Sequence, residues 1–189
     1  FSEQIDKIPN QSYGLSKYEA EQGLLEIAKN TSMEVVIIRP PLVYGPGVKG
    51  NLAKLITCIR KGIPLPFALV NNSRSFIAIE NLVDFILLCT DISKSSKAAN
   101  EIFVISDGQD ISLRKFIKKI SNAYQVNLFM LPLPLLIMKL LGKIFRKTDI
   151  VNSLLDNLQI NNSKAYILLN WQPIITIDKQ LEMMAKIDR

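Results

Sequence analysis

The sequence contains no histidine and very little cysteine, which excludes several kinds of active site. Without histidine among its 189 residues, the chain cannot form a Ser-His-Asp triad or a histidine-ligated metal centre. Its two cysteines, Cys58 and Cys89, lie far apart in the sequence and have no metal-ligand spacing, which favours a reducing, cytoplasmic context. Any reaction would therefore depend on tyrosine, lysine, carboxylates or a cofactor.

Concentrated charge and long apolar runs are also scarce. Lys and Arg number 23 against 17 Asp and Glu, a net charge of +6, but the basic residues are spread thinly outside 139–147. This distribution argues against a nucleic-acid partner and leaves anionic small molecules or a membrane surface as candidates. The most apolar run, 128–138, is interrupted by Pro132 and Pro134 and is shorter than the roughly 20 residues that span a bilayer.

The start of the sequence lacks a methionine and a signal-like apolar segment. The chain begins at Phe1, so we expect it to be a piece whose beginning lies elsewhere. Its composition, 48% hydrophobic and 21% charged, is that of an ordinary globular domain.

Helical and strand patterns alternate along the first 110 residues. An apolar stripe predicts a helix over 13–30, and the β-branched run 34–38 predicts a strand buried on both faces of a parallel sheet. Pro40 and Pro41 end that strand, and a Gly/Pro-rich loop follows through 45–50. The further predicted elements are a helix over 52–60, a strand over 75–79, a helix over 81–89 and a strand over 101–105.

Helical patterns dominate the rest of the chain. Ser112 is the expected N-cap of a helix that extends to about Tyr124. Further helices are predicted over 135–145, 162–169 and 176–187. An alternating α/β part followed by helices favours a sheet domain with a smaller mixed lobe attached.

Tyr13 and Lys17 stand four residues apart at the start of the first predicted helix, so both side chains leave the same helix face. Free tyrosine, with a pKa of about 10, is a poor proton acceptor at neutral pH. A neighbouring ammonium group favours the phenolate, and such a tyrosine could take a proton from a sugar hydroxyl. The same spacing also occurs on solvated helix faces with no function.

Several segments together resemble the extended short-chain dehydrogenase/reductase family, and most closely its NAD-dependent nucleotide-sugar epimerase/dehydratase branch. They are, in order, SYGLSKYEAEQ, IIRPPLVYGPG, GNLAKLI, SRSFIAIENLVDFI, NEIFVISDG and LNWQP, between Ser12 and Ile187. The resemblance implies an α/β fold, the carboxyl-terminal part of a Rossmann-type doubly wound parallel sheet plus a smaller mixed substrate lobe. By this resemblance, 1–44 and 75–108 belong to the NAD-binding domain, and 45–74 and 109–189 to the substrate-binding lobe.

The resemblance also implies roles for individual residues. Tyr13 corresponds to the catalytic base and Lys17 to its electrostatic partner, which also bonds the nicotinamide ribose. Pro40 and Pro41 fall where the backbone approaches the nicotinamide of NAD. From the residues alone, the two prolines are equally compatible with a simple strand terminator.

Two further residues match the positions that contact the substrate diphosphate, Asn51 with an amide and Arg74 with a guanidinium fork. Outside the family pattern, Asn51 would be a helix cap and Arg74 a surface charge. The segment Asn81-Leu82 and Trp171 match family positions that we interpret as structural, a helix start and an apolar packing group.

The sequence departs from the family pattern in several places. The Gly-rich turn for the NAD pyrophosphate and the catalytic Ser or Thr are absent, and we expect both in a missing amino-terminal half. No arginine occurs within 151–160, where the family often has another phosphate ligand, and Leu42 replaces a common substrate-binding asparagine. These differences leave the substrate open and allow for a relic that no longer catalyses.

The predicted helix near 135–147 combines apolar and basic residues. Lys139, Lys143, Arg146 and Lys147 alternate with or follow leucine, isoleucine and phenylalanine. Such a segment can lie on an anionic membrane, or it can pack on the substrate lobe while its lysines extend to water. The first arrangement would suit a lipid-linked sugar diphosphate, on which some relatives act.

Our sequence-based hypothesis is NAD-dependent epimerisation at C4 of a UDP-hexose or UDP-N-acetylhexosamine through a 4-keto intermediate. Tyr13 would remove the C4 hydroxyl proton as hydride passes to NAD. The alternatives are a dehydratase, a 4-keto reductase, a lipid-linked sugar-diphosphate epimerase and a non-catalytic relic. We expect no nucleic-acid partner, a possible homodimer, and a cytoplasmic location that includes the inner membrane surface.

Overall fold

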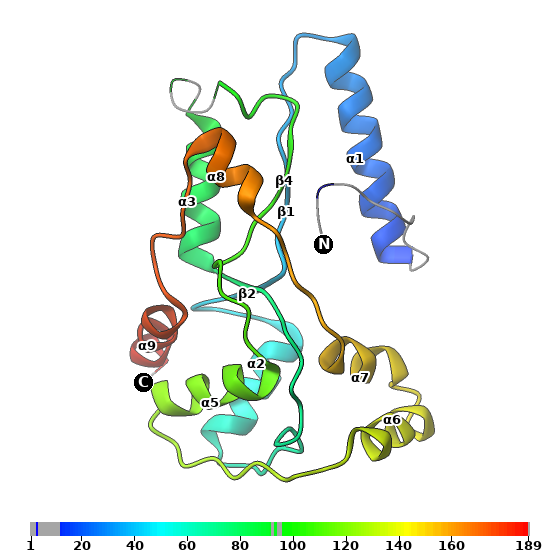
Figure 1. Ribbon diagram of the computed structural model, residues 1–189, viewed down its shortest axis with the longest axis vertical. Helices are drawn as coiled ribbons and strands as arrows, with labels where there is room; N and C mark the ends of the chain where they lie inside the picture. Colours follow the sequence, from blue (N-terminus) through cyan, green and yellow to red (C-terminus); the bar gives the residue numbers. More distant parts are fainter. Residues whose placement is uncertain (1–2, 4–11, 92, 94–95, 189) are drawn as a thin grey trace.

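Short parallel strands form the framework of the structure (Figure 1). The computed structural model describes residues 3, 12–91, 93 and 96–188. Strand β1 (Ile37–Arg39) pairs with β4 (Ile102–Val104), and β2 (Leu42–Tyr44) pairs with β3 (Phe76–Ala78). Ile37 lies opposite Ile102, and Leu42 opposite Phe76. Within the described residues, β1 has a strand partner on one side only.

The two prolines lie where the chain passes from the first strand pair to the second. Proline has no N–H to donate to a ladder, so Pro40 and Pro41 interrupt pairing, and the chain resumes as β2 at Leu42. The sequence did not predict β2. The predicted start of the first strand at Glu34 was also wrong: Val35 N–H donates to Asn100 Oδ1 at 3.1 Å, and the ladder begins only with β1.

Helices account for most of the remaining described chain. They are α1 (Ser12–Asn30), α2 (Gly50–Arg60), α3 (Ile79–Thr90), α5 (Leu113–Ala123), α6 (Leu135–Ile144), α7 (Thr148–Leu155), α8 (Ser163–Leu169) and α9 (Ile177–Ile187). Each predicted helix is present with small shifts at its ends. The N-cap prediction is confirmed, since Ser112 Oγ accepts a hydrogen bond from Lys115 N–H at 3.2 Å. Helix α7 was not predicted.

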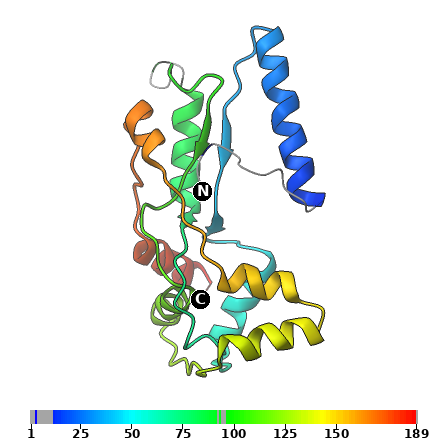
Figure 2. The ribbon, with the colours of Figure 1, turned by 45° about the vertical axis from the view of Figure 1, so that its right-hand side comes forward.

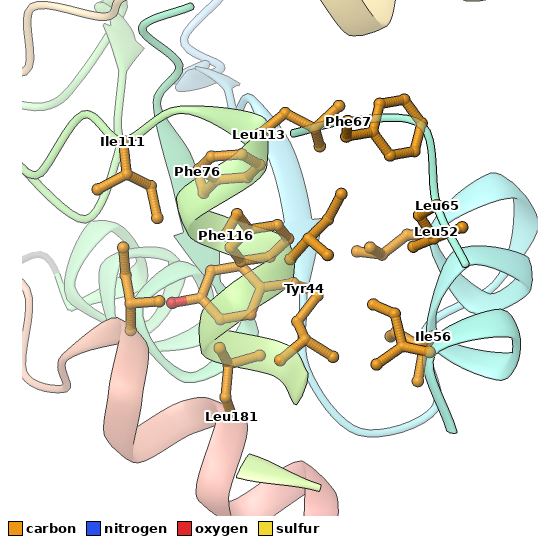
Figure 3. Packing of buried hydrophobic residues seen from close by; sticks show 14 of the residues in the cluster. Tyr44, Leu52, Ile56, Leu65, Phe67, Phe76, Ile111, Leu113, Phe116 and Leu181 are labelled. Carbon is orange, nitrogen blue, oxygen red and sulfur yellow. The ribbon is translucent and has the colours of Figure 1, made fainter. Parts of the chain in front are cut away.

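Strand β3 separates two apolar cores. Its three residues are almost completely buried, and successive side chains of a strand point to opposite faces. Phe76 and Ala78 pack with residues of α2, α5 and α9 in one core, which we call the lower core from its place in Figure 1. Ile77 packs with residues of α3 and β4 in the other, which we call the upper core. In the lower core, the rings of Phe76 and Phe116 stack at 4.1 Å (Figure 3).

In the upper part of the molecule, helices lie on both sides of the strands. Helices α3 and α8 lie on one side and α1 on the other, as Figures 1 and 2 show. Phe85 of α3 meets Trp171 edge to face at 5.0 Å, and Trp171 Nε1 donates to Asp84 at 2.8 Å. Trp171 therefore has the packing role that we expected. The arrangement confirms the expected α/β fold.

A partly buried polar network joins the carboxyl ends of the strands to the last helix. Tyr44 donates its hydroxyl to Asp107 at 2.7 Å, and Asp107 also accepts from Ala78 N–H at 2.9 Å and from the Asn81 amide at 2.7 Å. The Asn81 carbonyl oxygen accepts the N–H groups of Ile174 and Ile175. Asn81, completely buried, is thus a structural residue, as expected.

The first prediction concerns the acceptor at the centre of this network. Asp107→Leu leaves the Tyr44 hydroxyl and the Ala78 N–H without an acceptor, and it leaves the Asn81 amide nitrogen with the Ile175 carbonyl oxygen alone. We therefore expect the free energy of unfolding to fall by about 3 kcal/mol or more. Asp107→Asn keeps one oxygen acceptor and should lose less. Urea denaturation of both variants against the wild type measures the two losses. Equal losses would contradict the assigned role of the acceptor oxygens.

The second prediction concerns pH. Burial raises the pKa of Asp107, although its hydrogen bonds from Tyr44, Ala78 and Asn81 act in the opposite direction. A raised pKa in the folded state means that the contribution of Asp107 is greatest below about pH 4 and is lost as pH rises through the folded-state pKa. The wild type should therefore lose stability relative to Asp107→Asn over this rise, measured by urea denaturation at a series of pH values. A difference that grows with pH in favour of the wild type would contradict it.

Candidate functional site

Tyr13 and Lys17 share one face of the first turns of α1. Lys17 Nζ lies 5.8 Å from the centre of the Tyr13 ring, close enough for a cation–π contact. Both side chains are exposed, with Tyr13 75% accessible. Figures 1 and 2 show this end of α1 directed toward the lower part of the molecule, where α7 lies. The pair predicted from the sequence is therefore assembled and accessible.

An ion pair attaches α1 to the strands. Arg39, the last residue of β1, donates from Nε to both carboxylate oxygens of Glu21 at 3.0 and 3.1 Å, and its Nη2 pairs with the same carboxylate. Beyond this contact, α1 is held by a small cluster in which Ala28 is its only buried residue. The sequence reasoning missed Arg39. Its position directly before Pro40 was the available signal.

The two prolines directly follow this anchored strand end. Pro40 and Pro41 lie at the carboxyl end of β1, on the side where parallel α/β sheets bind their ligands. The Arg39–Glu21 ion pair connects the same strand end to α1, the helix that contains Tyr13 and Lys17. The backbone leading into the prolines and the Tyr13–Lys17 pair thus share one anchor.

Asn51 lies in the first turn of α2, with its side chain exposed. The N-cap residue, Lys49, makes no capping hydrogen bond through its side chain, and the first turn holds no acidic residue. The first N–H groups of a helix favour an anion when nothing else pairs with them. The Asn51 amide beside them is a further donor suited to an anionic group.

Arg74 is engaged by the end of α7. Its Nη1 donates to the backbone carbonyl oxygens of Ser153 and of Asp156, the latter at 2.9 Å. Burial lowers the pKa of Arg74, and the nearby Asp156 partly offsets this. An arginine remains protonated at neutral pH despite such a shift. Arg74 is therefore a half-buried cation that anchors α7, and its Nε and Nη2 have no hydrogen-bond partner within the described residues.

Asn72 holds the same end of α7, and the sequence reasoning missed it. Its amide nitrogen donates to the carbonyl oxygens of Leu154 and Asp156, and its oxygen accepts Leu113 N–H at 3.0 Å. A polar pocket of 320 Å³ opens beside it, lined by residues of 71–73, 110–112, 115 and 157. The run of amide residues before Arg74 was the only sequence signal for this arrangement.

The structure does not unite all predicted site residues by direct contact. Among the described residues, no hydrogen bond or ion pair joins Tyr13 or Lys17 to Asn51 or Arg74. Within the same residues, no group of three or more histidine, cysteine, aspartate or glutamate side chains could hold a metal ion. None of the described helices is long and apolar enough to cross a membrane.

Comparison with known proteins identifies the family of the chain. The model of the NAD-dependent epimerase/dehydratase family matches residues 2–106. A UDP-glucose 4-epimerase of Vibrio cholerae is 44% identical over 187 residues, which are 98% of this chain and 56% of that protein. An N-acetyl-α-D-glucosaminyl-diphospho-ditrans,octacis-undecaprenol 4-epimerase of Escherichia coli O157:H7 is 26% identical over 67% of this chain and 38% of its own length.

Solved structures share the fold at low sequence identity. A UDP-glucuronic acid 4-epimerase from Bacillus cereus in complex with NAD matches with a TM-score of 0.74 and 20% identity, over 98% of this chain and 53% of that one. A UDP-N-acetylglucosamine 4-epimerase from the same species matches with a TM-score of 0.75 and 15% identity, over 100% and 59%.

The chain spans little more than half the length of the Vibrio cholerae relative and of the two Bacillus cereus structures. The family match nevertheless covers more than half of the chain, and the relatives share its α/β fold. The chain therefore belongs to the NAD-dependent epimerase/dehydratase family.

Proposed function

We propose that this chain is the carboxyl-terminal part of an NAD-dependent enzyme that epimerises a nucleotide sugar, a UDP-hexose or UDP-N-acetylhexosamine, at C4. The observation that carries the proposal is the accessible pair of Tyr13 and Lys17 on one face of α1. The similarity to the Vibrio cholerae UDP-glucose 4-epimerase supports the choice of reaction and substrate.

The residues present fit one end of the cofactor. Tyr13 and Lys17 offer an exposed hydroxyl and an exposed ammonium, donors suited to the hydroxyl groups of the nicotinamide ribose. Pro40 and Pro41, at the carboxyl end of β1, would lie against the nicotinamide. Among the described residues, no Gly-rich turn follows β1, so we propose that a separate amino-terminal segment holds the pyrophosphate.

In the proposed mechanism, Tyr13 acts as the proton-transfer group. As a phenolate, it accepts the proton of the C4 hydroxyl while a hydride leaves C4, which produces a 4-keto sugar. NAD, when bound, supplies the acceptor for that hydride and its later donor. Lys17 places its ammonium group 5.8 Å from the centre of the Tyr13 ring. Return of the proton from Tyr13 to the oxygen completes the exchange after the keto sugar has presented its other face.

The substrate diphosphate would be held by the lower lobe. Asn51 offers an exposed amide at the start of α2, and Arg74 offers the two guanidinium nitrogens that α7 leaves unpaired among the described residues. Charge-assisted hydrogen bonds from a guanidinium are among the strongest available to a phosphate. Arg74 would thus link the position of α7 to the presence of substrate.

We propose two further partners of the working enzyme, an amino-terminal segment and a second copy of the protein. Strand β1 has an open edge within the described structure, where the sheet of the amino-terminal segment can continue. Leu24 and Ile27 of α1 are 43% and 47% exposed, and a homodimer contact would cover them. We propose both partners as parts of the working enzyme.

The third prediction tests the function directly. In the protein that also contains the amino-terminal segment, Tyr13→Phe should lower turnover of UDP-glucose or UDP-N-acetylglucosamine by about 100-fold or more, because it removes only the proton-transfer group. NAD binding should change little, whereas Lys17→Met should weaken both. Tyr18→Phe removes the same atom from the same helix and is the matched control, expected to keep turnover within about twofold.

Product analysis by NMR distinguishes the alternatives. The C4 epimer supports the proposal, whereas a 4-keto-6-deoxy product indicates a dehydratase. Reduction of an added 4-keto sugar indicates a reductase, and conversion of only a lipid-linked sugar diphosphate indicates that substrate class. Equal turnover by the Tyr13→Phe and Tyr18→Phe proteins would exclude Tyr13 as the base. No reaction with any of these substrates would favour a relic.

The fourth prediction concerns Arg74. Arg74→Ala should weaken UDP binding about 10- to 150-fold, since a charge-assisted and bidentate contact is lost. The diphosphate is remote from C4, so the loss should fall mainly on KM. Arg74→Lys should recover little, because an ammonium keeps the charge without the planar fork. Calorimetric titration with UDP measures each variant.

The control for Arg74 is Asn72→Ala. Asn72 holds the same end of α7, so this variant loosens α7 without removing the cation. We expect its UDP affinity to change by less than about threefold. Equal losses in the Asn72 and Arg74 variants would mean that the anchoring of α7, and not a phosphate contact, explains the effect.

A further inference from the structure

Helix α6 exposes an apolar stripe on the side directed away from the protein. Its buried residues, Met138 and Gly142, are four apart and mark the inner side. Leu136, Leu140 and Ile144 form a second stripe at the same spacing on the outer side, and they are 82%, 57% and 63% exposed. A helix that only packs on a core has polar residues on its outer side. Figures 1 and 2 show α6 at the lower edge of the molecule.

Close packing against α7 fixes this orientation. A Cβ atom at Gly142 would lie 2.9 Å from Cγ2 of Val151, so the two helices approach where α6 has no side chain. Rotating α6 to bury its outer stripe would remove this contact. An apolar groove of 290 Å³ runs between α6, α7 and the segment at Pro66 and Phe67. Phe145 lines its rim and is 68% exposed.

Positive charge flanks the exposed stripe. Lys139 and Lys143 repeat at the same spacing beside Leu136 and Leu140, and Arg146 and Lys147 follow the helix. The sequence contains no acidic residue from 135 to 147. Within the described residues, none of these four cations forms an ion pair with a carboxylate. Apolar and unneutralised basic groups therefore share one surface, which we call the α6 face.

We propose that the α6 face docks on the surface of an anionic lipid bilayer. The outer leucine and isoleucine side chains would enter the acyl-chain boundary, and the lysines would contact phosphate headgroups. The helix has 10 residues, so it would lie along the surface. This proposal is independent of the reaction that the enzyme catalyses.

Charge favours this occupant over a second copy of the chain. In a two-fold symmetric contact, a face meets itself. Two α6 faces would bring like charges together, since each carries four cations and no acidic residue between 135 and 147. An anionic lipid surface supplies the opposite charge and an apolar layer beneath it, which matches both components of the face.

The fifth prediction uses the full chain and vesicles. The wild type should sediment with vesicles of equimolar phosphatidylglycerol and phosphatidylcholine, and much less with pure phosphatidylcholine. Lys139→Glu combined with Lys143→Glu should weaken binding by about tenfold or more, because two attractive charges become repulsive. Leu136→Gln combined with Leu140→Gln should weaken it by a similar factor. High salt should weaken binding of the wild type.

Matched controls change equally exposed residues elsewhere. Ile167→Gln in α8, where the side chain is 71% exposed, and Lys118→Glu in α5 should bind like the wild type. Circular dichroism should give the same thermal unfolding for all variants, since every altered side chain is exposed. Failure of the wild type to bind anionic vesicles, or equal binding to neutral vesicles, would overturn the proposal. So would a wild-type dimer in analytical ultracentrifugation that the double glutamine variant abolishes while vesicle binding is unaffected.

Discussion

The hydrogen-bonded chain from Tyr44 through Asp107 to Asn81 is the interaction on which the arrangement of the two cores depends. It joins the end of β2, the segment after β4, the start of α3 and the segment before α9. Tyr44 also packs edge to face on Phe116 at 5.3 Å, so the same residue belongs to the lower core (Figure 3). Burial of these polar groups is tolerable because each finds a partner. Their geometry fixes the lower core relative to the carboxyl ends of the strands.

The elements that contribute to the candidate site differ in how much of their surface is buried in the structure. Asn51 lies in α2, which packs in the lower core, and Arg74 directly precedes Ser75 and the buried strand β3. Helix α1 has little buried surface and depends on the Arg39–Glu21 pair. A partly buried, bidentate pair constrains direction as well as distance. Among the described residues, the Arg39–Glu21 pair is thus the polar link from the end of β1 to the helix of Tyr13 and Lys17, alongside the small apolar cluster at Ala28.

Much of this organisation could be predicted from the sequence, and the failures have physical causes. Helical periodicity located α5 and α9, and a capping serine located the start of α5. The same periodicity was present in α7, where Ile150, Val151, Leu154 and Leu155 repeat, but the helix is short and lies between polar stretches. Strand β2 was not predicted because the two prolines before it indicate the end of a strand. Tyr13 and Lys17 are four residues apart, so their shared helix face could be predicted from the sequence. The anchoring of Arg74 by α7 could not, because it joins residues about 80 positions apart.

Within the described part of the chain, β1 pairs with another strand on one side only. An unpaired strand edge presents a row of peptide N–H and C=O groups that accept any extended segment as a neighbour. Its short length and the charged Arg39 at its end limit that hazard. An extended segment that reaches this edge during synthesis can add to it as a strand, so the order in which the segments of the polypeptide meet would govern how much of it escapes aggregation.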